Sequence, residues 1–268
     1  MVIRLIVNAD DFGFTRDVNR GIVEAHRGGI LTATTLMANG DAFDDAIACA
    51  RDTPSLDVGC HAVFVQGRSV LDASRALPAT LQELVRSLVR RELPVYDEVR
   101  AQVKKLIDAG IRPSHIDTHK HTHLLPPVLD AIARVAREFE IPWVRRPFDF
   151  GIDRRARVMK RGVALGMRAL APRFGRTLEG LRTTDHFAGF QITGALNAGS
   201  LADVLEKLPP GLTEIMCHPG RMGPELRAAP TRLKESREIE LAALLSPAAR
   251  QLIERRGIEL VNYRDVTG

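Results

Sequence analysis

Short apolar runs and amphipathic stretches alternate along almost the whole chain of 268 residues. The first apolar run, Ile3 to Val7, is followed after a polar turn by an amphipathic stretch from Val18 to His26. Continuous apolar runs are typical of strands that are buried on both faces, whereas apolar positions three or four residues apart are typical of helices. This alternation constrains the chain to a mostly parallel sheet that is covered by helices.

The pattern predicts seven strands, each separated from the next by helical or irregular segments. After the first strand, we expect strands at 31–37, 58–65, 115–118, 143–145, 214–217 and 259–261. We expect helices at 18–26, 42–51, 81–91, 96–109, 128–139, 236–245 and 248–256. No Gly-x-Gly-x-x-Gly turn follows the first strand, which argues against an open dinucleotide-binding sheet. The predicted fold class is therefore α/β, as one distorted TIM-like (β/α) barrel with about seven parallel strands.

Length and composition predict the number of domains and the cellular compartment. The length and the 45% of hydrophobic residues are compatible with one domain over 1–268, carrying a basic helical insertion at about 150–182. No apolar run is long enough to span a membrane, and the first residues do not resemble a signal peptide. Three cysteines without a Cys-x-x-Cys pair favour neither disulfides nor a thiolate zinc site. We therefore expect a cytoplasmic protein, and a homodimer as its oligomeric state.

The net charge of +5 and the pI near 9.4 raise the question of a nucleic-acid partner. Aromatic residues make up only 5% of the chain, so the stacking platforms that single-stranded nucleic acids need are scarce. We expect no nucleic-acid partner.

Four of the eight histidines lie within one short segment. His115 is followed by Asp117 and then by His119, His121 and His123 at every second position. Imidazole is a common ligand of divalent metals, and side chains two residues apart leave an extended strand on the same face. The run therefore indicates a metal site, and the alternative is a solvated polar edge strand.

Two adjacent carboxylates, Asp10 and Asp11, follow the first predicted strand. Active sites of barrels lie at the carboxyl ends of the strands, so both carboxylates are expected in the active site. Adjacent side chains diverge, so one carboxylate would bind a cation while the other acts as a general base. The alternative is helix capping, in which an Asx turn leads into Thr15 and Asp17.

Two further histidines mark the ends of other strands. His61 lies in the apolar third strand, and together with Asp11 and His119 it would form a set of one carboxylate and two imidazoles that leaves positions open for water and substrate. His218 ends the strand before a Pro-Gly turn, where an imidazole could donate a proton to a leaving group. The alternatives are a buried core histidine for His61 and a turn histidine bonded to the backbone for His218.

Four motifs in this order resemble the YdjC-like carbohydrate deacetylase family over nearly the whole chain. They are Asn8-Ala9-Asp10-Asp11-Phe12-Gly13, Gly59-Cys60-His61, the segment from Ser114 to His123, and Met216-Cys217-His218-Pro219. Members of that family resemble distorted β/α barrels that bind one divalent cation and remove acetyl groups from N-acetylated sugars; a relative acts in hopanoid lipid biosynthesis. Where the family often has Asn two residues after the third-strand histidine, this chain has Val63.

The resemblance implies a role for each motif residue. Asp11, His61 and His119 would hold the metal, Asp10 would serve as base and His218 as acid. His121 and His123 would surround the metal site or face the substrate, because a site with three protein ligands must stay open to act. Asp117 would orient a neighbouring imidazole. The metal would be zinc or magnesium, with manganese and cobalt as alternatives, and the substrate an N-acetylated sugar or glycolipid.

The segment between Arg154 and Arg176 interleaves basic and apolar residues, as an amphipathic helix does. Three uses are open for it: a solvated surface helix, a lid over the substrate, or a peripheral contact with acidic lipid headgroups at the inner face of the membrane. The next segment places aromatics beside Asp185 and His186, which suggests a substrate-binding surface.

Two other functions compete with a deacetylase. A phosphoesterase also uses histidine and carboxylate clusters, with one or two metals, and a non-catalytic protein could use the same residues as a structural metal site.

Overall fold

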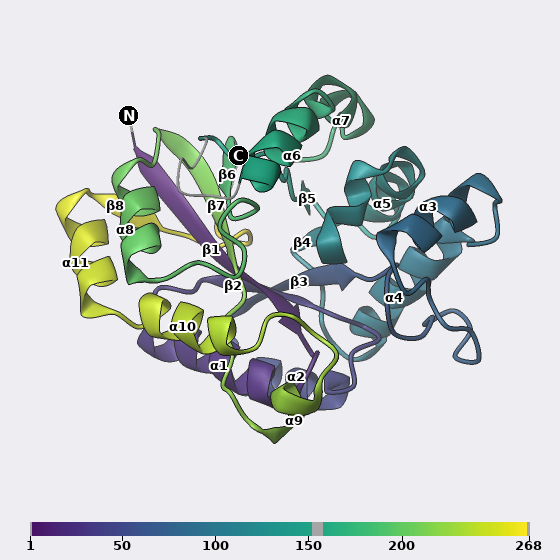
Figure 1. Cartoon of the computed structure of the whole chain (residues 1–268), viewed down its shortest axis with the longest axis horizontal. Helices are drawn as coiled ribbons and strands as arrows, with labels where there is room; N and C mark the ends of the chain where they lie inside the picture. Colours follow the sequence, from purple (N-terminus) through teal and green to yellow (C-terminus); the bar gives the residue numbers. More distant parts are fainter. Residues whose placement is uncertain (1, 152–157, 267–268) are drawn as a thin grey trace.

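The computed structural model describes residues 2–151 and 158–266. Seven parallel strands form a curled sheet in the order β5-β4-β3-β2-β1-β7-β6. An eighth strand, β8, pairs with β1 and stands outside this order. Figure 1 shows the helices arranged around the strands. The α/β barrel that the sequence predicts is confirmed.

The strands lie at β1 Ile3–Phe12, β2 Ala33–Leu36, β3 Asp57–Ala62, β4 His115–Thr118, β5 Trp143–Val144, β6 His186–Ala188, β7 Gly211–Cys217 and β8 Ile258–Leu260. Seven of them were predicted, whereas β6, which spans three residues, was missed. Strands of two or three residues leave little periodic signal in a sequence, and length alone does not separate β6 from β5 and β8, which were predicted.

The helices lie at α1 Arg16–Gly28, α2 Phe43–Arg51, α3 Leu81–Val89, α4 Val95–Asp108, α5 Pro126–Glu138, α6 Val158–Arg168, α7 Ala171–Thr177, α8 Ala198–Glu206, α9 Pro224–Ala228, α10 Glu235–Leu244 and α11 Pro247–Arg255. A 3-10 segment, η1, covers His119–Leu124. Several helices begin where the sequence offers a capping side chain, as when the Thr15 hydroxyl accepts a hydrogen bond from the backbone N–H of Val18. No helix of the described residues is both long and apolar enough to cross a bilayer.

The sheet curls far enough for its two edge strands, β5 and β6, to approach each other. The backbone N–H of Val144, in β5, donates to the carbonyl of Arg182 at 2.9 Å, and that of Phe150 donates to the carbonyl of Phe187, in β6, at 2.8 Å. Among the described residues, isolated bridges of this kind join the two ends in place of a continuous pairing of strands, so the barrel is distorted. All strands run in parallel, so their carboxyl ends meet at one end of the barrel.

The long first strand organises this barrel. Along β1, residues 3–9 pair with β7, residues 3–5 also pair with β8, and β2 takes over that second edge from Asn8 onwards. Leu5, Ile6 and Val7 are completely buried. Burial on both faces explains the continuous apolar run with which the chain begins.

Candidate metal centre and catalytic site

Asp10 and Asp11 both face the carboxyl end of the barrel because the end of β1 is irregular. Between Ala9 and Phe12 the register against β2 shifts by one residue, and Asp11 adopts a left-handed backbone conformation with φ of 69°. Such a bulge redirects a side chain that a regular strand would send to the opposite face. The two carboxylates can therefore serve one site while making different contacts.

Three predicted ligands lie together. The Nδ1 atom of His119 is 3.1 Å from Oδ1 of Asp11, and Nε2 of His61 is 3.4 Å from the same oxygen. The two imidazole nitrogens are 3.3 Å apart. These residues come from β1, β3 and the segment just after β4, so the parallel sheet brings together positions that are up to 108 residues apart.

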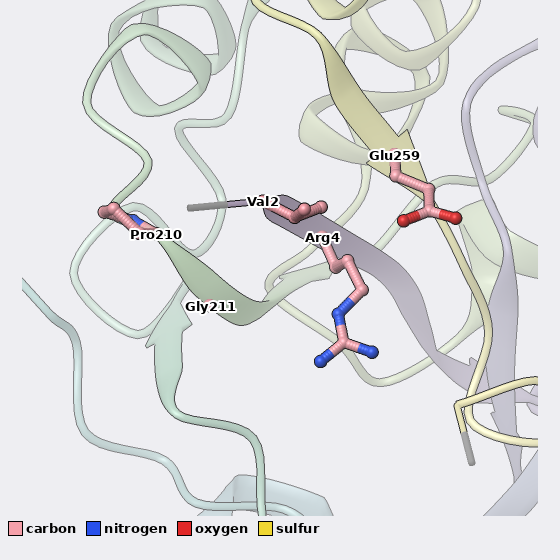
Figure 2. A pocket seen from close by; sticks show the side chains of 5 residues that line it. All are labelled: Val2, Arg4, Pro210, Gly211 and Glu259. Carbon is pink, nitrogen blue, oxygen red and sulfur yellow. The ribbon is translucent and has the colours of Figure 1, made fainter. Parts of the chain in front are cut away.

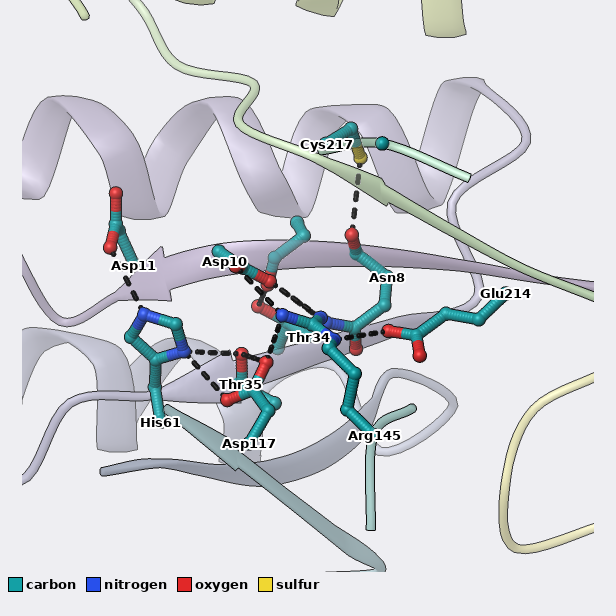
Figure 3. Close-up of polar contacts among 12 residues, drawn as sticks. Asn8, Asp10, Asp11, Thr34, Thr35, His61, Asp117, Arg145, Glu214 and Cys217 are labelled. Atoms are coloured by element: carbon teal, nitrogen blue, oxygen red, sulfur yellow. Dashed lines mark hydrogen bonds and ion pairs between the residues drawn. The ribbon is translucent and has the colours of Figure 1, made fainter. Parts of the chain in front are cut away.

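Asp117 fixes the orientation of the His61 ring. The two residues are directly opposed in the β3–β4 register, and Oδ1 of Asp117 lies 2.6 Å from Nδ1 of His61. Figure 3 shows His61 between Asp117 on one side and Asp11 on the other. With a proton on Nδ1, the lone pair of Nε2 faces the other two candidate ligands, which is how a carboxylate prepares an imidazole to bind a metal.

His218 lies next to Asp10 at the end of β7. Its Nε2 atom is 3.9 Å from Oδ2 of Asp10, and both residues are nearly buried. Burial lowers the pKa of His218 to about 4, so the imidazole is neutral at pH 7. The two residues that we predicted as base and acid thus share the site with the three candidate ligands.

His121 and His123 do not join the cluster. The strand ends at Thr118, and left-handed φ angles of 56° at Lys120 and 52° at His121 turn the chain into η1. The expectation that the three histidines share one face of an extended strand is therefore wrong. The ring of His121 packs against Phe187 and Phe190, and Nδ1 of His123 lies 2.6 Å from the Thr118 hydroxyl.

Asp185 and His186 lie at the opposite end of the barrel. The Asp185 carboxylate accepts a hydrogen bond from the backbone N–H of Leu212 at 2.8 Å, and His186 lies 3.2 Å from the carbonyl of Pro210. Both contacts are at the start of β7, whereas the cluster lies beyond its end. The neighbouring Phe187 is fully buried, so its ring is not available to a substrate, and Asp185 and His186 lie away from the candidate ligands.

The same end of the barrel carries a hollow of about 480 Å³. Figure 2 shows its lining residues, which are Val2, Arg4, Pro210, Gly211 and Glu259. These residues surround the beginnings of β1, β7 and β8. The hollow is therefore separate from the three candidate ligands.

Comparison with known proteins places the chain in a family. The family description "YdjC-like protein" matches residues 4–255. The chain belongs to the YdjC-like family. A protein of Brevibacillus brevis named carbohydrate deacetylase is 31% identical, with 98% of this chain and 99% of that protein covered. One of Geobacillus stearothermophilus with the same name is also 31% identical, over 97% and 96% of the two chains.

A solved structure extends the likeness to three dimensions. The crystal structure of an Enterococcus faecalis V583 protein, named for cellobiose-phosphate cleavage, superimposes with a TM-score of 0.77 and covers 100% of both chains at 26% identity. The barrel of this YdjC-like chain therefore has a known counterpart over its full length.

Sequence reasoning missed Arg145, which is central to this YdjC-like site. It follows β5 and is 1% exposed, and its guanidinium donates to Asp10 at 2.7 and 2.9 Å and to Glu214 at 2.7 Å. It also forms an ion pair with Asp117. Figure 3 shows the guanidinium between Asp10 and Glu214. Its position at a predicted strand end, and a glutamate inside an apolar strand, were signals that could have revealed the pair.

A second buried arginine supports Asp11. Arg237 in α10 donates to Oδ2 of Asp11 at 2.5 Å, which leaves Oδ1 directed at the two histidines. One turn further along the helix, Glu240 accepts a hydrogen bond from the backbone N–H of His218 at 2.5 Å. Nothing in the sequence identified these residues, because α10 lies more than 220 residues from Asp11 and carries no motif.

The arginines also control the charge of the two carboxylates. Burial would raise the pKa of Asp10, but Arg145 and nearby imidazoles offset it and hold that pKa well below the usual value. Burial would also raise the pKa of Asp11, but Arg237, His119 and His61 outweigh this effect and hold that pKa well below the usual value. Both side chains are therefore ionised at neutral pH.

The three candidate ligands fit a divalent cation. Donors that bind one cation at ~2.1 Å lie roughly 3.0 to 3.4 Å apart, and the three donor atoms here are separated by 3.1, 3.3 and 3.4 Å. The site also favours positive charge: although burial acts in the opposite direction, Asp117 and Asp10 raise the pKa of His61 to about 10. A carboxylate with two imidazoles suits zinc as well as magnesium, manganese or cobalt.

Proposed function

We propose that this protein is a metal-dependent hydrolase that removes an acetyl group from an N-acetylated amino sugar, on an oligosaccharide or a glycolipid. The observation that carries this proposal is the set of three converging ligands, Asp11, His61 and His119, with Asp10 and His218 beside it. The name carbohydrate deacetylase of relatives over 97% or more of this chain supports the reaction class.

Asp11, His61 and His119 would hold one divalent ion, most simply zinc or magnesium. When bound, such an ion polarises a carbonyl group and lowers the pKa of water toward ~7. Three protein ligands leave room for the substrate and for water. Asp117 and Arg237 keep two of these ligands in place by their contacts with His61 and Asp11.

Asp10 would act as the general base. Its carboxylate is ionised, and the two hydrogen bonds from Arg145 fix its position without protonating it. As water attacks the acetyl carbon, Asp10 would accept the proton that the water loses. Since Asp10 directly precedes Asp11 in the chain, its carboxylate stays next to the metal ligands.

His218 would protonate the departing amine. A low pKa makes its protonated form a strong acid, and the Asp10 carboxylate 3.9 Å away stabilises that form when the proton arrives. Before the C–N bond breaks, the proton that Asp10 accepts from water would pass to His218 over this distance, and His218 would then give it to the departing amine. The proton lost by water thus becomes the proton gained by the amine, and His218 returns to its neutral form.

The proposal is tested by acetate release from a panel of N-acetylated amino sugars and glycolipids. We expect activity to vanish when a chelator removes the metal and to return when a divalent ion is restored. Asp10→Asn should retain the metal but lower kcat about 100- to 10,000-fold, because a general base contributes that much.

Three outcomes separate the alternatives. Release of phosphate from phosphate esters, without release of acetate, would identify a phosphoesterase. A protein that binds the metal but turns over neither class of substrate would be a non-catalytic metal protein. Undiminished acetate release by Asp10→Asn would show that Asp10 is not the base.

A further inference from the structure

Helix α6 presents apolar side chains to solvent. Met159, Val163 and Leu165 are 77%, 47% and 51% exposed, and Leu170, just after the helix, is 40% exposed. The opposite side of the helix, with Ala164 and Met167, is buried against the protein. An ordinary surface helix buries its apolar side and exposes a polar one, so this helix has a second apolar side that the described residues leave uncovered.

The charged residues of this segment of the sequence are all of one sign. Between Asp153 and Glu179 the sequence contains eight basic residues and no acidic residue. Arg154, Arg155 and Arg157 lie outside the described residues, whereas Arg168, Arg173 and Arg176 are exposed on α6 and α7. Exposed apolar side chains flanked by arginines are the pattern of a helix that lies in the interface of an anionic bilayer.

We propose that α6 and α7 form a docking surface for anionic membranes, in which Met159, Val163, Leu165 and Leu170 enter the headgroup region and Arg173 and Arg176 contact lipid phosphates. A second copy of this chain fits the face less well, because a symmetric contact would bring the arginines of the two copies together. Binding of this surface to a membrane requires no catalytic turnover, so it does not depend on the deacetylase proposal.

The two helices are attached to the segments that border the metal centre. Phe174 of α7 packs against the ring of His123 in η1, with ring centroids 5.7 Å apart. The Arg168 guanidinium donates to the backbone carbonyl of Asp149 at 2.7 Å, and the carboxylate of Asp149 accepts hydrogen bonds from the backbone N–H groups of residues 189–191. Figure 1 shows α6 and α7 together at one edge of the molecule. Docking would thus hold the same end of the barrel that carries the site near the bilayer.

The test is co-sedimentation of the full chain with vesicles. We expect binding to vesicles of equal parts phosphatidylglycerol and phosphatidylcholine, little binding to phosphatidylcholine alone, and weaker binding at high salt. The triple variant Met159→Ser, Val163→Ser, Leu165→Ser should lower the partition coefficient at least about tenfold, because three apolar side chains no longer enter the bilayer. Arg173→Gln with Arg176→Gln should lower it about fivefold for each arginine.

A matched control lies on α3. Leu81, Val85 and Val89 are 44%, 43% and 79% exposed, and their replacement by serine should leave vesicle binding unchanged. Equal loss in both triple variants would overturn the proposal, as would the absence of binding by the unmodified protein. If the α6 variant instead changed the sedimentation coefficient without vesicles, the face would belong to a protein–protein contact. The arginine pair tests the same surface should the triple variant fold poorly.

Discussion

At the scale of single residues, the candidate metal centre depends on residues that contact the candidate ligands from behind. His61 is held by Asp117, and Asp11 is held by Arg237. Partners of this kind fix the tautomer and the direction of a ligand, so they influence affinity without touching the ion.

We predict that Asp117→Asn weakens metal binding about 10- to 100-fold, since the amide no longer places a negative charge behind His61. Isothermal titration of the metal-free protein with zinc measures this change. The matched control is Asp57→Asn: Asp57 is a buried aspartate that pairs with Arg264 at 2.8 Å, but it lies at the start of β3, whereas Asp117 pairs with His61 near the end of that strand. Similar affinity losses in both variants would contradict the role assigned to Asp117.

At the scale of elements, the position of His218 depends on how closely α1 approaches the turn after β7. A Cβ atom at Gly21 would lie 2.5 Å from Cα of Gly220, which is closer than non-bonded atoms come. Helix and turn are therefore in backbone contact, and only glycine permits this. The contact links the first helix to the turn that carries the predicted acid.

We predict that Gly21→Ala lowers the free energy of unfolding by about 1–3 kcal/mol and also lowers kcat, because the added methyl group forces the turn away from α1. Urea unfolding and acetate release measure the two effects. Gly166→Ala is the control, because its Cβ would meet nothing within 4 Å. Within a helix, this substitution should stabilise the protein by about 0.5–1 kcal/mol. A Gly21→Ala variant as stable as that control would refute the close approach.

At the scale of the whole molecule, the buried charges around the site make stability depend on pH. Burial raises the pKa of Glu240 to about 7, whereas an unfolded glutamate titrates near ~4.3. Between these values the folded protein keeps a proton that the unfolded chain releases. This carboxyl group therefore costs no stability at low pH, and it destabilises the fold progressively as the pH rises toward 7.

We predict that Glu240→Gln gains stability relative to the unmodified protein as the pH rises from 4 to 8, by about 3 kcal/mol over this window. Glutamine still accepts the hydrogen bond from the His218 backbone but cannot ionise. Urea unfolding at several pH values measures the gain. Glu138→Gln should behave in the opposite sense, because the Tyr96 hydroxyl and Arg100 lower the pKa of Glu138. Parallel stability curves for Glu240→Gln and the unmodified protein would disprove the assignment.

Several expectations at this scale stay predictions. They are the organisation of 1–268 as one domain with an insertion at about 150–182, the cytoplasmic location, the absence of a nucleic-acid partner and the homodimer. The basic helix that we predicted between Arg154 and Arg176 is described only from Val158 onwards, as α6 and α7.

The sequence by itself determined the strand and helix order, because local apolar periodicity decides which segments can bury a face. It also determined the candidate ligands Asp11, His61 and His119, because polar side chains at strand ends meet at one end of a parallel barrel. Tertiary structure alone decided that Arg145, Arg237 and Glu240 support them, and that His121 and His123 turn away. Those facts depend on contacts between distant segments and on two left-handed residues, and neither leaves a periodic trace in a sequence.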